Sequence, residues 1–299
     1  MAFADAYLTG GQVRYLRRRM TELERRHGRV PAAVPRVRHD PAGVVRAPVI
    51  PEGADRAFPT KDQLLRNRNA KRLGQGAYGQ VWLDPGPPPR AVKYGDVKES
   101  EYEHGKVLGN ELGVGPAVYK YEGRPQGNRF FRGSDKLAME YLEGQTIGDE
   151  YANKPLDRER AQASADVIQH AMKMYRAGYA HNDLHMGNVM RLPDGSLKII
   201  DYGMVSKGYR HAIHEILYGR LNIGWLTSAA NRASDRALYD DLRVAMAKSR
   251  DEYENHPGAP AGSRGSLDDD DQYFKDLVDR LDKDIGEIFR KNGYDYAAA

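Results

Sequence analysis

Three oxygen-bearing side chains in the second half of the chain are spaced so that they could hold a divalent cation. Asp183 and Asn188 share a Gly-containing loop, and Asp201 ends a short apolar run directly before a turn. Apolar stretches flank Pro193-Asp194-Gly195-Ser196, and Asp-Gly is a typical hairpin turn, so the chain is predicted to fold Asp201 back toward Asn188. Oxygen ligands with open positions suit Mg²⁺ that carries substrate phosphates.

This stretch resembles the catalytic loop and the metal-binding segment of the protein-kinase-like superfamily. His181-Asn182-Asp183 with Asn188 matches His-x-Asp-x-x-x-x-Asn, and Asp201-Tyr202-Gly203 is a variant of Asp-Phe-Gly. The form His-x-Asp-Leu-His-x-Gly-Asn is similar to microbial members, including antibiotic and sugar kinases and atypical bacterial or phage Ser/Thr kinases. The resemblance implies that Asp183 orients the acceptor hydroxyl and accepts its proton, and that Asn188 and Asp201 bind magnesium.

A glycine-rich stretch earlier in the chain fits the same resemblance. Between Leu73 and Leu83 the sequence reads Gly-x-Gly-x-x-Gly-x-Val, and Ala91-Val92-Lys93 follows a Pro-rich turn. In kinases this pattern forms a hairpin over ATP and then a strand whose lysine contacts the phosphates. The Pro-rich turn argues against a Rossmann unit, in which a helix follows the glycines directly. The implied nucleotide-binding residues are Gly74, Gly76, Gly79, Val81 and Lys93.

Lys93 needs a carboxylate partner, which kinases place on the next helix. The helix-like segment from Val97 to Leu112 carries several glutamates. Glu103 fits best, because Val107 and Leu108 follow it at core spacing, and Glu101 is the alternative. The sequence therefore predicts Glu103 as the partner of Lys93 in catalysis.

A strand that runs into a linker, Leu137 to Gly144, resembles the hinge between the two lobes of a kinase. The resemblance implies that Met139 borders the adenine pocket. It also implies that backbone groups of Glu140 and Leu142 bind the adenine ring by hydrogen bonds.

The predicted fold is α+β: an antiparallel β N-lobe with one helix and a helical C-lobe, with extra N- and C-terminal helices. The N-lobe is expected at 60–142 and the C-lobe at 143–256. Residues 1–30 have apolar residues at helical spacing among arginines, and residues 31–59 carry too many prolines for a helix and form a linker or wrapping arm. A linker and an amphipathic helix occupy 257–299. We expect that helix to dock on the body, although either terminal helix could bind a partner.

Composition narrows the class of protein. The chain has no cysteine, which excludes disulfides and thiolate metal sites. No apolar run approaches the roughly 20 residues of a membrane span, and the N-terminus lacks a secretory h-region. The net charge of +4 does not by itself indicate nucleic-acid binding. A cytoplasmic protein is expected, in the host cytoplasm if it comes from a phage or is an effector.

The resemblance favours an ATP- and Mg-dependent Ser/Thr protein kinase with a protein substrate. The glycine-rich loop, Ala-Val-Lys and the hinge support this class. A small-molecule kinase of the aminoglycoside or sugar type is the alternative, favoured by Leu-His-x-Gly-Asn and by the lack of Ala-Pro-Glu. A binding or assembly module with a kinase fold is a third. Asn182 replaces the arginine that receives a phosphorylated activation loop in regulated kinases, which predicts activity without that phosphorylation.

Overall fold

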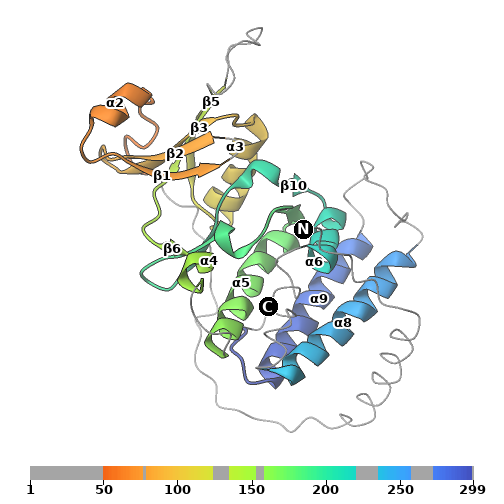
Figure 1. Cartoon of the computed structure of the whole chain (residues 1–299). Coiled ribbons are helices and arrows are strands. Elements are labelled where there is room, and N and C mark those ends of the chain that lie inside the picture. The colour runs from red at the N-terminus through yellow and green to blue at the C-terminus, as the bar shows by residue number, and fades with distance from the viewer. Residues whose placement is uncertain are drawn as a thin grey trace, which may run out of the picture.

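The structure is a computed structural model that describes residues 50–76, 79–123, 135–152, 158–219, 235–256 and 272–297. Over these residues the chain forms an antiparallel sheet with a helix beside it, and a lobe of packed helices below the sheet in Figure 1. The predicted α+β class is therefore confirmed. The predicted basic helix within 1–30 and most of the predicted arm at 31–59 lie outside the described residues.

The N-lobe sheet places Lys93 in its middle strand. The described strands are antiparallel and lie in the order β1-β2-β3-β5-β4. Lys93 stands opposite Val81 of β2 and Leu137 of β5, so neighbours on both sides set its position. Helix α3 (Glu99–Gly105) follows β3 and continues as a π-helical turn, Lys106–Glu111. The strands are β1 (Lys71–Gly76), β2 (Gly79–Asp84), β3 (Arg90–Gly95), β4 (Val118–Glu122) and β5 (Asp135–Glu140).

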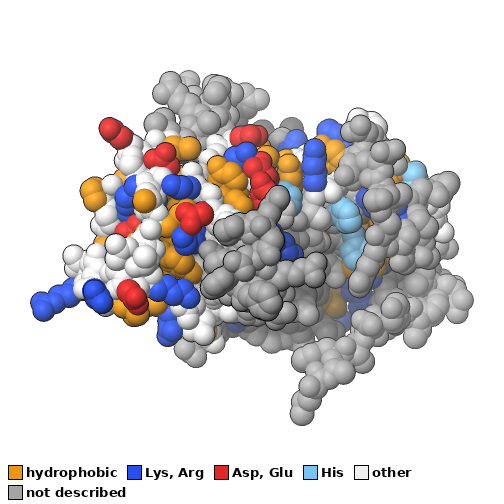
Figure 2. All heavy atoms as spheres, turned by 90° about the horizontal axis from the view of Figure 1, so that it is seen from above, with side chains coloured by type: hydrophobic (Ala, Val, Ile, Leu, Met, Phe, Trp, Pro, Cys, Tyr) orange, Lys and Arg blue, Asp and Glu red, His pale blue; other side chains and the backbone are white. Residues whose placement is uncertain are grey.

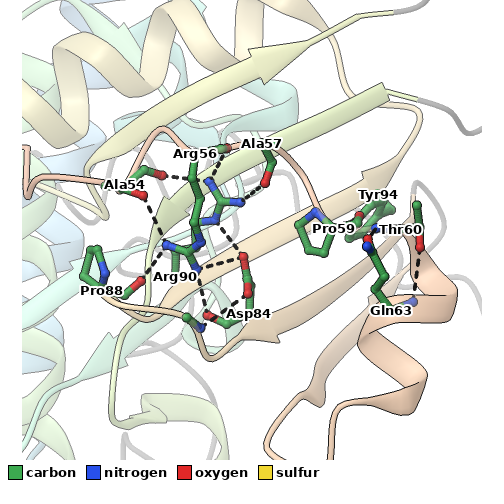
Figure 3. Close-up of polar contacts among 12 residues, drawn as sticks. Ala54, Arg56, Ala57, Pro59, Thr60, Gln63, Asp84, Pro88, Arg90 and Tyr94 are labelled. Atoms are coloured by element: carbon green, nitrogen blue, oxygen red, sulfur yellow. Dashed lines mark hydrogen bonds and ion pairs between the residues drawn. The ribbon is translucent and has the colours of Figure 1, made fainter.

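Residues 50–59 pack against the N-lobe and are fastened to β3 near both of its ends (Figure 3). At the start of β3, Arg90 is fully buried. At the other end, the Tyr94 hydroxyl donates to the Pro59 carbonyl at 2.6 Å. Since side chains alternate along a strand, Arg90 and Tyr94 share one face of the sheet and Lys93 points from the other. The Arg90 guanidinium donates to the carbonyls of Ala54, Arg56 and Ala57 and pairs with Asp84.

Helix α2 (Lys61–Arg66) adds to the cover on this face. It begins with a capping box: the Thr60 hydroxyl accepts from the backbone of Gln63, and the Gln63 side chain accepts from the backbone of Thr60. Leu64 of α2 is buried in a small cluster with Val92 and Tyr94. Residues 50–66 and β3 therefore share apolar packing as well as hydrogen bonds, while the predicted lobe boundary at residue 60 stays a prediction.

The C-lobe packs helices around one apolar core (Figure 1). Its main described helices are α5 (Arg158–Arg176), α6 (Tyr209–Tyr218), α8 (Arg236–Glu254) and α9 (Gln272–Lys291), and α4 (Ile147–Glu150) is a single turn. Helix α9 contacts α5, α6 and α8. The expectation that the C-terminal amphipathic helix docks on the body is confirmed. Its buried apolar residues are Phe274, Leu277, Val278, Leu281, Ile285 and Phe289.

Short strands connect these helices to the loops that carry the predicted catalytic residues. Strand β7 pairs with β10, and β6, β8 and β9 form a second small sheet. Their bounds are β6 (Gln145–Thr146), β7 (Tyr179–Ala180), β8 (Val189–Arg191), β9 (Leu197–Ile199) and β10 (Ser206–Lys207).

The surface seen in Figure 2 carries basic and acidic side chains interspersed over its described part. Neither the basic nor the acidic side chains form a continuous patch on that part of the face. Among the residues that the structure describes, no helix combines the length and the apolar character that crossing a bilayer requires.

Candidate active site

The loop with Asp183 and the segment with Asp201 are brought together by the predicted hairpin. Strands β8 and β9 pair with Val189 opposite Ile199, and the turn between them closes at Gly195, whose φ of 84° suits glycine. The Ile200 amide donates to the Asn188 carbonyl at 2.9 Å. This part of the prediction is confirmed, because the backbone before Asp201 is bonded to the backbone of Asn188.

Lys93 contacts two carboxylates, one from each lobe. Its ammonium lies 2.6 Å from Glu101 Oε1 on α3 and 3.0 Å from Asp201 Oδ1. The side chains of Lys93 and Glu101 are buried, whereas that of Asp201 is 49% exposed. The ammonium thus stands between a buried carboxylate that holds it and a carboxylate that remains open to a ligand.

The prediction that Glu103 is the partner of Lys93 is wrong. Glu103 points to solvent and pairs with Lys106 at 2.7 Å, and Glu101, the alternative, faces the lysine. Helix residues two positions apart do not share a face. The prediction counted back four positions from Val107, which is only partly buried, and so selected the wrong face. Counting back from the fully buried Leu108 leads to Gly105 and Glu101, which are also buried, and the glycine among them concealed that face.

Attraction within this cluster stabilises the charged forms of Lys93 and Asp201. Burial by itself lowers the pKa of Lys93, but the attraction of Glu101 and Asp201 outweighs it and the pKa is raised above its ordinary value. Burial also acts on Asp201, yet Lys93 outweighs it and the pKa of that carboxyl is lowered. Lys93 is therefore a permanent cation and Asp201 a permanent anion near neutral pH, as binding of phosphate and a metal cation requires.

The catalytic loop has internal hydrogen bonds that leave its ligand atoms available. The Asn188 side-chain amide donates to the Asp183 carbonyl at 2.9 Å, so its nitrogen is used and its oxygen is the atom suited to a cation. His181 is fully buried, its Nε2 lies 3.0 Å from the Ile200 carbonyl, and burial lowers its pKa. A neutral His181 thus braces the loop through a hydrogen bond to the backbone just before Asp201. His185 also supports the loop, because its Nδ1 accepts from the Gly187 amide.

Glu215 was missed by the sequence analysis. It is buried on α6, and its carboxylate accepts backbone N–H groups of His181, Asn182 and Leu184. The hydroxyl of Tyr175 is a further partner. The available signal was one acid among the apolar residues of the segment that forms α6. Helix α6 therefore holds the backbone of the catalytic loop through this single carboxylate.

Burial raises the pKa of Glu215 from its ordinary 4.5 to about 7, although the backbone donors oppose that rise. A raised carboxyl pKa means that the folded chain binds the proton more tightly than the unfolded chain. The resulting stabilisation is fully present below pH 4.5 and is lost as pH rises through 7. Relative to Glu215→Gln, the free energy of unfolding of the unchanged protein is expected to fall by about 3 kcal/mol over that interval.

Urea denaturation of both proteins at several pH values measures this difference. The altered hydrogen bonds of the glutamine shift the free energy of unfolding by an amount that does not depend on pH. Only the change of the free energy of unfolding with pH is therefore compared between the two proteins. A difference that stays constant between pH 4.5 and 7.5 would contradict the assignment.

The predicted nucleotide contacts fall into two groups. An added Cβ at Gly74 or Gly76 meets no atom within 4 Å, whereas at Gly79 it would lie 2.2 Å from the Tyr94 carbonyl oxygen, with φ at 154°. Packing of the chain thus requires glycine at Gly79 but leaves open space at the other two. Such an open cradle, together with Lys93 and the oxygen donors, fits a bound nucleotide and cation. Val81 lies across from Lys93.

The predicted hinge residues lie where the chain leaves β5. Met139 pairs with Ala91 of β3, and the backbone of Glu140 donates to the Ala117 carbonyl. Leu142 follows the end of the strand. Their role at an adenine ring stays a prediction.

Comparison with known proteins agrees with this geometry. The model of the ABC1 atypical kinase-like domain matches residues 131–223, a range that holds the catalytic loop and Asp201 but not Lys93. The probable serine/threonine-protein kinase mkcC of Dictyostelium discoideum is 22% identical over 175 residues, which cover 56% of this chain and 19% of that protein. The chain thus spans about a fifth of the length of the curated relative that it matches.

Proposed function

We propose that this chain, which belongs to the protein-kinase-like superfamily, is a phosphotransferase that moves the γ-phosphoryl group of ATP to a hydroxyl with the help of Mg²⁺. The observation that carries the proposal is the contact of Lys93 with Asp201, 3.0 Å long, which joins a cation from the N-lobe to an anion from the C-lobe. Lys93 and Asp201 come from segments far apart in the chain, and packing does not require them to meet at a half-exposed position. Binding of phosphate and a metal cation would account for that arrangement.

Each residue of the site has a separate role in the proposed transfer. Bound ATP would supply the phosphoryl group, and its cation would offset part of the negative charge of the phosphates. Lys93, held by Glu101, positions the phosphates. Asp201 and the side-chain oxygen of Asn188 would hold the cation, and Asp183 orients the acceptor hydroxyl and takes its proton. Phosphoryl transfer depends chiefly on positioning and charge neutralisation, which this set provides.

A serine or threonine of a protein is the acceptor that we favour. The similarity to a probable serine/threonine-protein kinase of Dictyostelium discoideum supports it, as do the glycine-rich hairpin and Ala-Val-Lys. The second candidate is a small hydroxyl compound, because α6 begins at Tyr209, soon after Asp201, and leaves little chain there for a peptide-binding platform. A binding module without turnover is the third.

Labelled ATP separates these candidates. The purified chain is incubated with γ-labelled ATP and Mg²⁺, with generic protein substrates and with aminoglycosides and sugars, and mass spectrometry locates phosphate on the chain itself. Label on protein that disappears in Asp183→Asn supports the protein kinase. Label on a small molecule alone supports the second candidate. Binding of ATP and Mg²⁺ without transfer to any acceptor would contradict the proposal of an enzyme.

The glycine-rich hairpin allows a matched pair of substitutions. Gly76→Ala is expected to leave the free energy of unfolding unchanged and to raise the Kd for ATP about tenfold, because it obstructs backbone approach to the phosphates without a clash in the free chain. Gly79→Ala is expected to cost about 2 kcal/mol or more of stability, because of its left-handed φ and its overlap with Tyr94. Urea denaturation and fluorescent-nucleotide titration measure both. Equal stability losses for the two variants would contradict this division.

A further inference from the structure

The side chain of Asn182 connects the catalytic loop to the segment that follows Asp201. Its amide nitrogen donates to the Met204 carbonyl at 2.8 Å and to the Ser206 hydroxyl oxygen at 2.9 Å. Asn182 is exposed, yet its backbone φ is +62°, a left-handed value that asparagine tolerates better than most residues. The backbone N–H of the same residue is bonded to Glu215. One residue of the catalytic loop therefore contacts two other parts of the C-lobe, the segment that follows Asp201 and helix α6.

The segment from Asp201 to Gly208 is short, and both of its ends are held by other contacts. Asp201 itself has a left-handed φ of 67° and bonds Lys93. At the far end, Ser206 and Lys207 pair with β7, and the Gly208 amide donates to the Gly178 carbonyl. The Asn182 contacts fall on Met204, between these ends, and on Ser206, at the far end. Asn182, which directly precedes Asp183, thus holds the middle of the segment as well as its far end.

We propose that Asn182 is a positioning residue, whose amide clamps the Asp201 segment onto the catalytic loop and so sets the separation of Asp201 and Asp183. This rests on the proposed function, in which these two carboxylates serve the same transfer. The clamp consists of unmodified side-chain and backbone atoms that are present in the chain as synthesised. It therefore needs no phosphoryl group on the segment to order it.

Two substitutions test the clamp in a graded way. Asn182→Gly removes both donated hydrogen bonds while glycine accepts the left-handed φ without strain. Ser206→Ala removes one of the two acceptors and leaves Met204 in place. Asn255→Ala is the matched control, because Asn255 is also an exposed asparagine whose amide bonds to a carbonyl, that of Asp251 at the end of α8.

Hydrogen exchange on the nucleotide-free protein is the first readout. In Asn182→Gly, amides within 202–208 are expected to exchange about tenfold faster or more, Ser206→Ala is expected to give a smaller change, and exchange in α5 is expected to stay unchanged. This arm does not depend on catalysis, so it decides the clamp even if no phosphoryl transfer is found. Unchanged exchange at 202–208, or faster exchange throughout the chain, would overturn the proposal.

The Mg²⁺ requirement of transfer is the second readout. Asn182→Gly is expected to raise the Mg²⁺ concentration for half-maximal activity about tenfold and to lower kcat, while the KM for ATP at saturating Mg²⁺ stays within about twofold. A merely structural role would instead lower the amount of active protein and leave the Mg²⁺ requirement unchanged, and that result would overturn the positioning role. Asn255→Ala is expected to match the unchanged protein in both readouts.

Discussion

Asp183→Asn is expected to lower kcat for phosphoryl transfer by about 10²–10⁴-fold, the usual contribution of a positioned general base. Asparagine has the same shape and keeps the backbone carbonyl that accepts from Asn188. It cannot accept the proton of the acceptor hydroxyl. The KM for ATP is expected to change little, because the proposed function assigns the phosphates and the cation to Lys93 and Asp201 rather than to Asp183. Single-turnover transfer from labelled ATP measures the rate.

Asp194→Asn is the control for this experiment. Asp194 lies in the turn of the same β8–β9 hairpin, is exposed, and bonds only Ser196 among the contacts described. It offers an identical chemical change away from the proposed site, and full activity is expected. Unaltered transfer by Asp183→Asn would rule out Asp183 as the general base.

Glu101→Gln is expected to destabilise the protein strongly. Glutamine keeps the size of the side chain but removes the buried charge that faces Lys93 at 2.6 Å. Breaking a buried ion pair costs about 3–5 kcal/mol, and we expect about 3 kcal/mol because Asp201 remains beside the lysine. Lys93 then depends on Asp201 alone, so kcat/KM for ATP is expected to fall as well. Denaturation and steady-state kinetics measure the two effects.

Glu103→Gln makes the same chemical change one helical face away. Glu103 is half exposed and pairs only with the exposed Lys106 among the contacts described, and such surface pairs contribute little. Stability and kcat/KM are expected to match those of the unchanged protein. If the two variants behaved in the reverse order, Glu103 would be the partner of Lys93 in solution and the observed pairing would be wrong.

The difference between these two glutamates shows where sequence reasoning ended. Helical spacing identified the segment that carries the partner of Lys93, and the motif identified Lys93 itself. The choice between Glu101 and Glu103 depended on the face that α3 turns to the sheet. The buried face carries Glu101, Gly105 and Leu108, and a glutamate and a glycine among its positions leave no apolar pattern that marks it in the sequence.

Glu215 and Asn182 illustrate the same limit. Neither residue is unusual for its position in the chain, and no spacing in the surrounding sequence predicts its contacts. Glu215 becomes important because α6 packs under the catalytic loop, and Asn182 because the segment after Asp201 returns beside it. Arg90 is a further case, since the carbonyls it binds lie more than 30 positions earlier in the chain.

The sequence by itself determined the features that depend on neighbours in the chain. These are the Asp-Gly hairpin that returns Asp201 to Asn188, the C-terminal amphipathic helix and the α+β class. Local backbone preferences and apolar periodicity are properties of short stretches, so a single sequence reveals them. Only the tertiary structure decided which charges meet, because that depends on how packed elements are oriented and on which side chains lose contact with water.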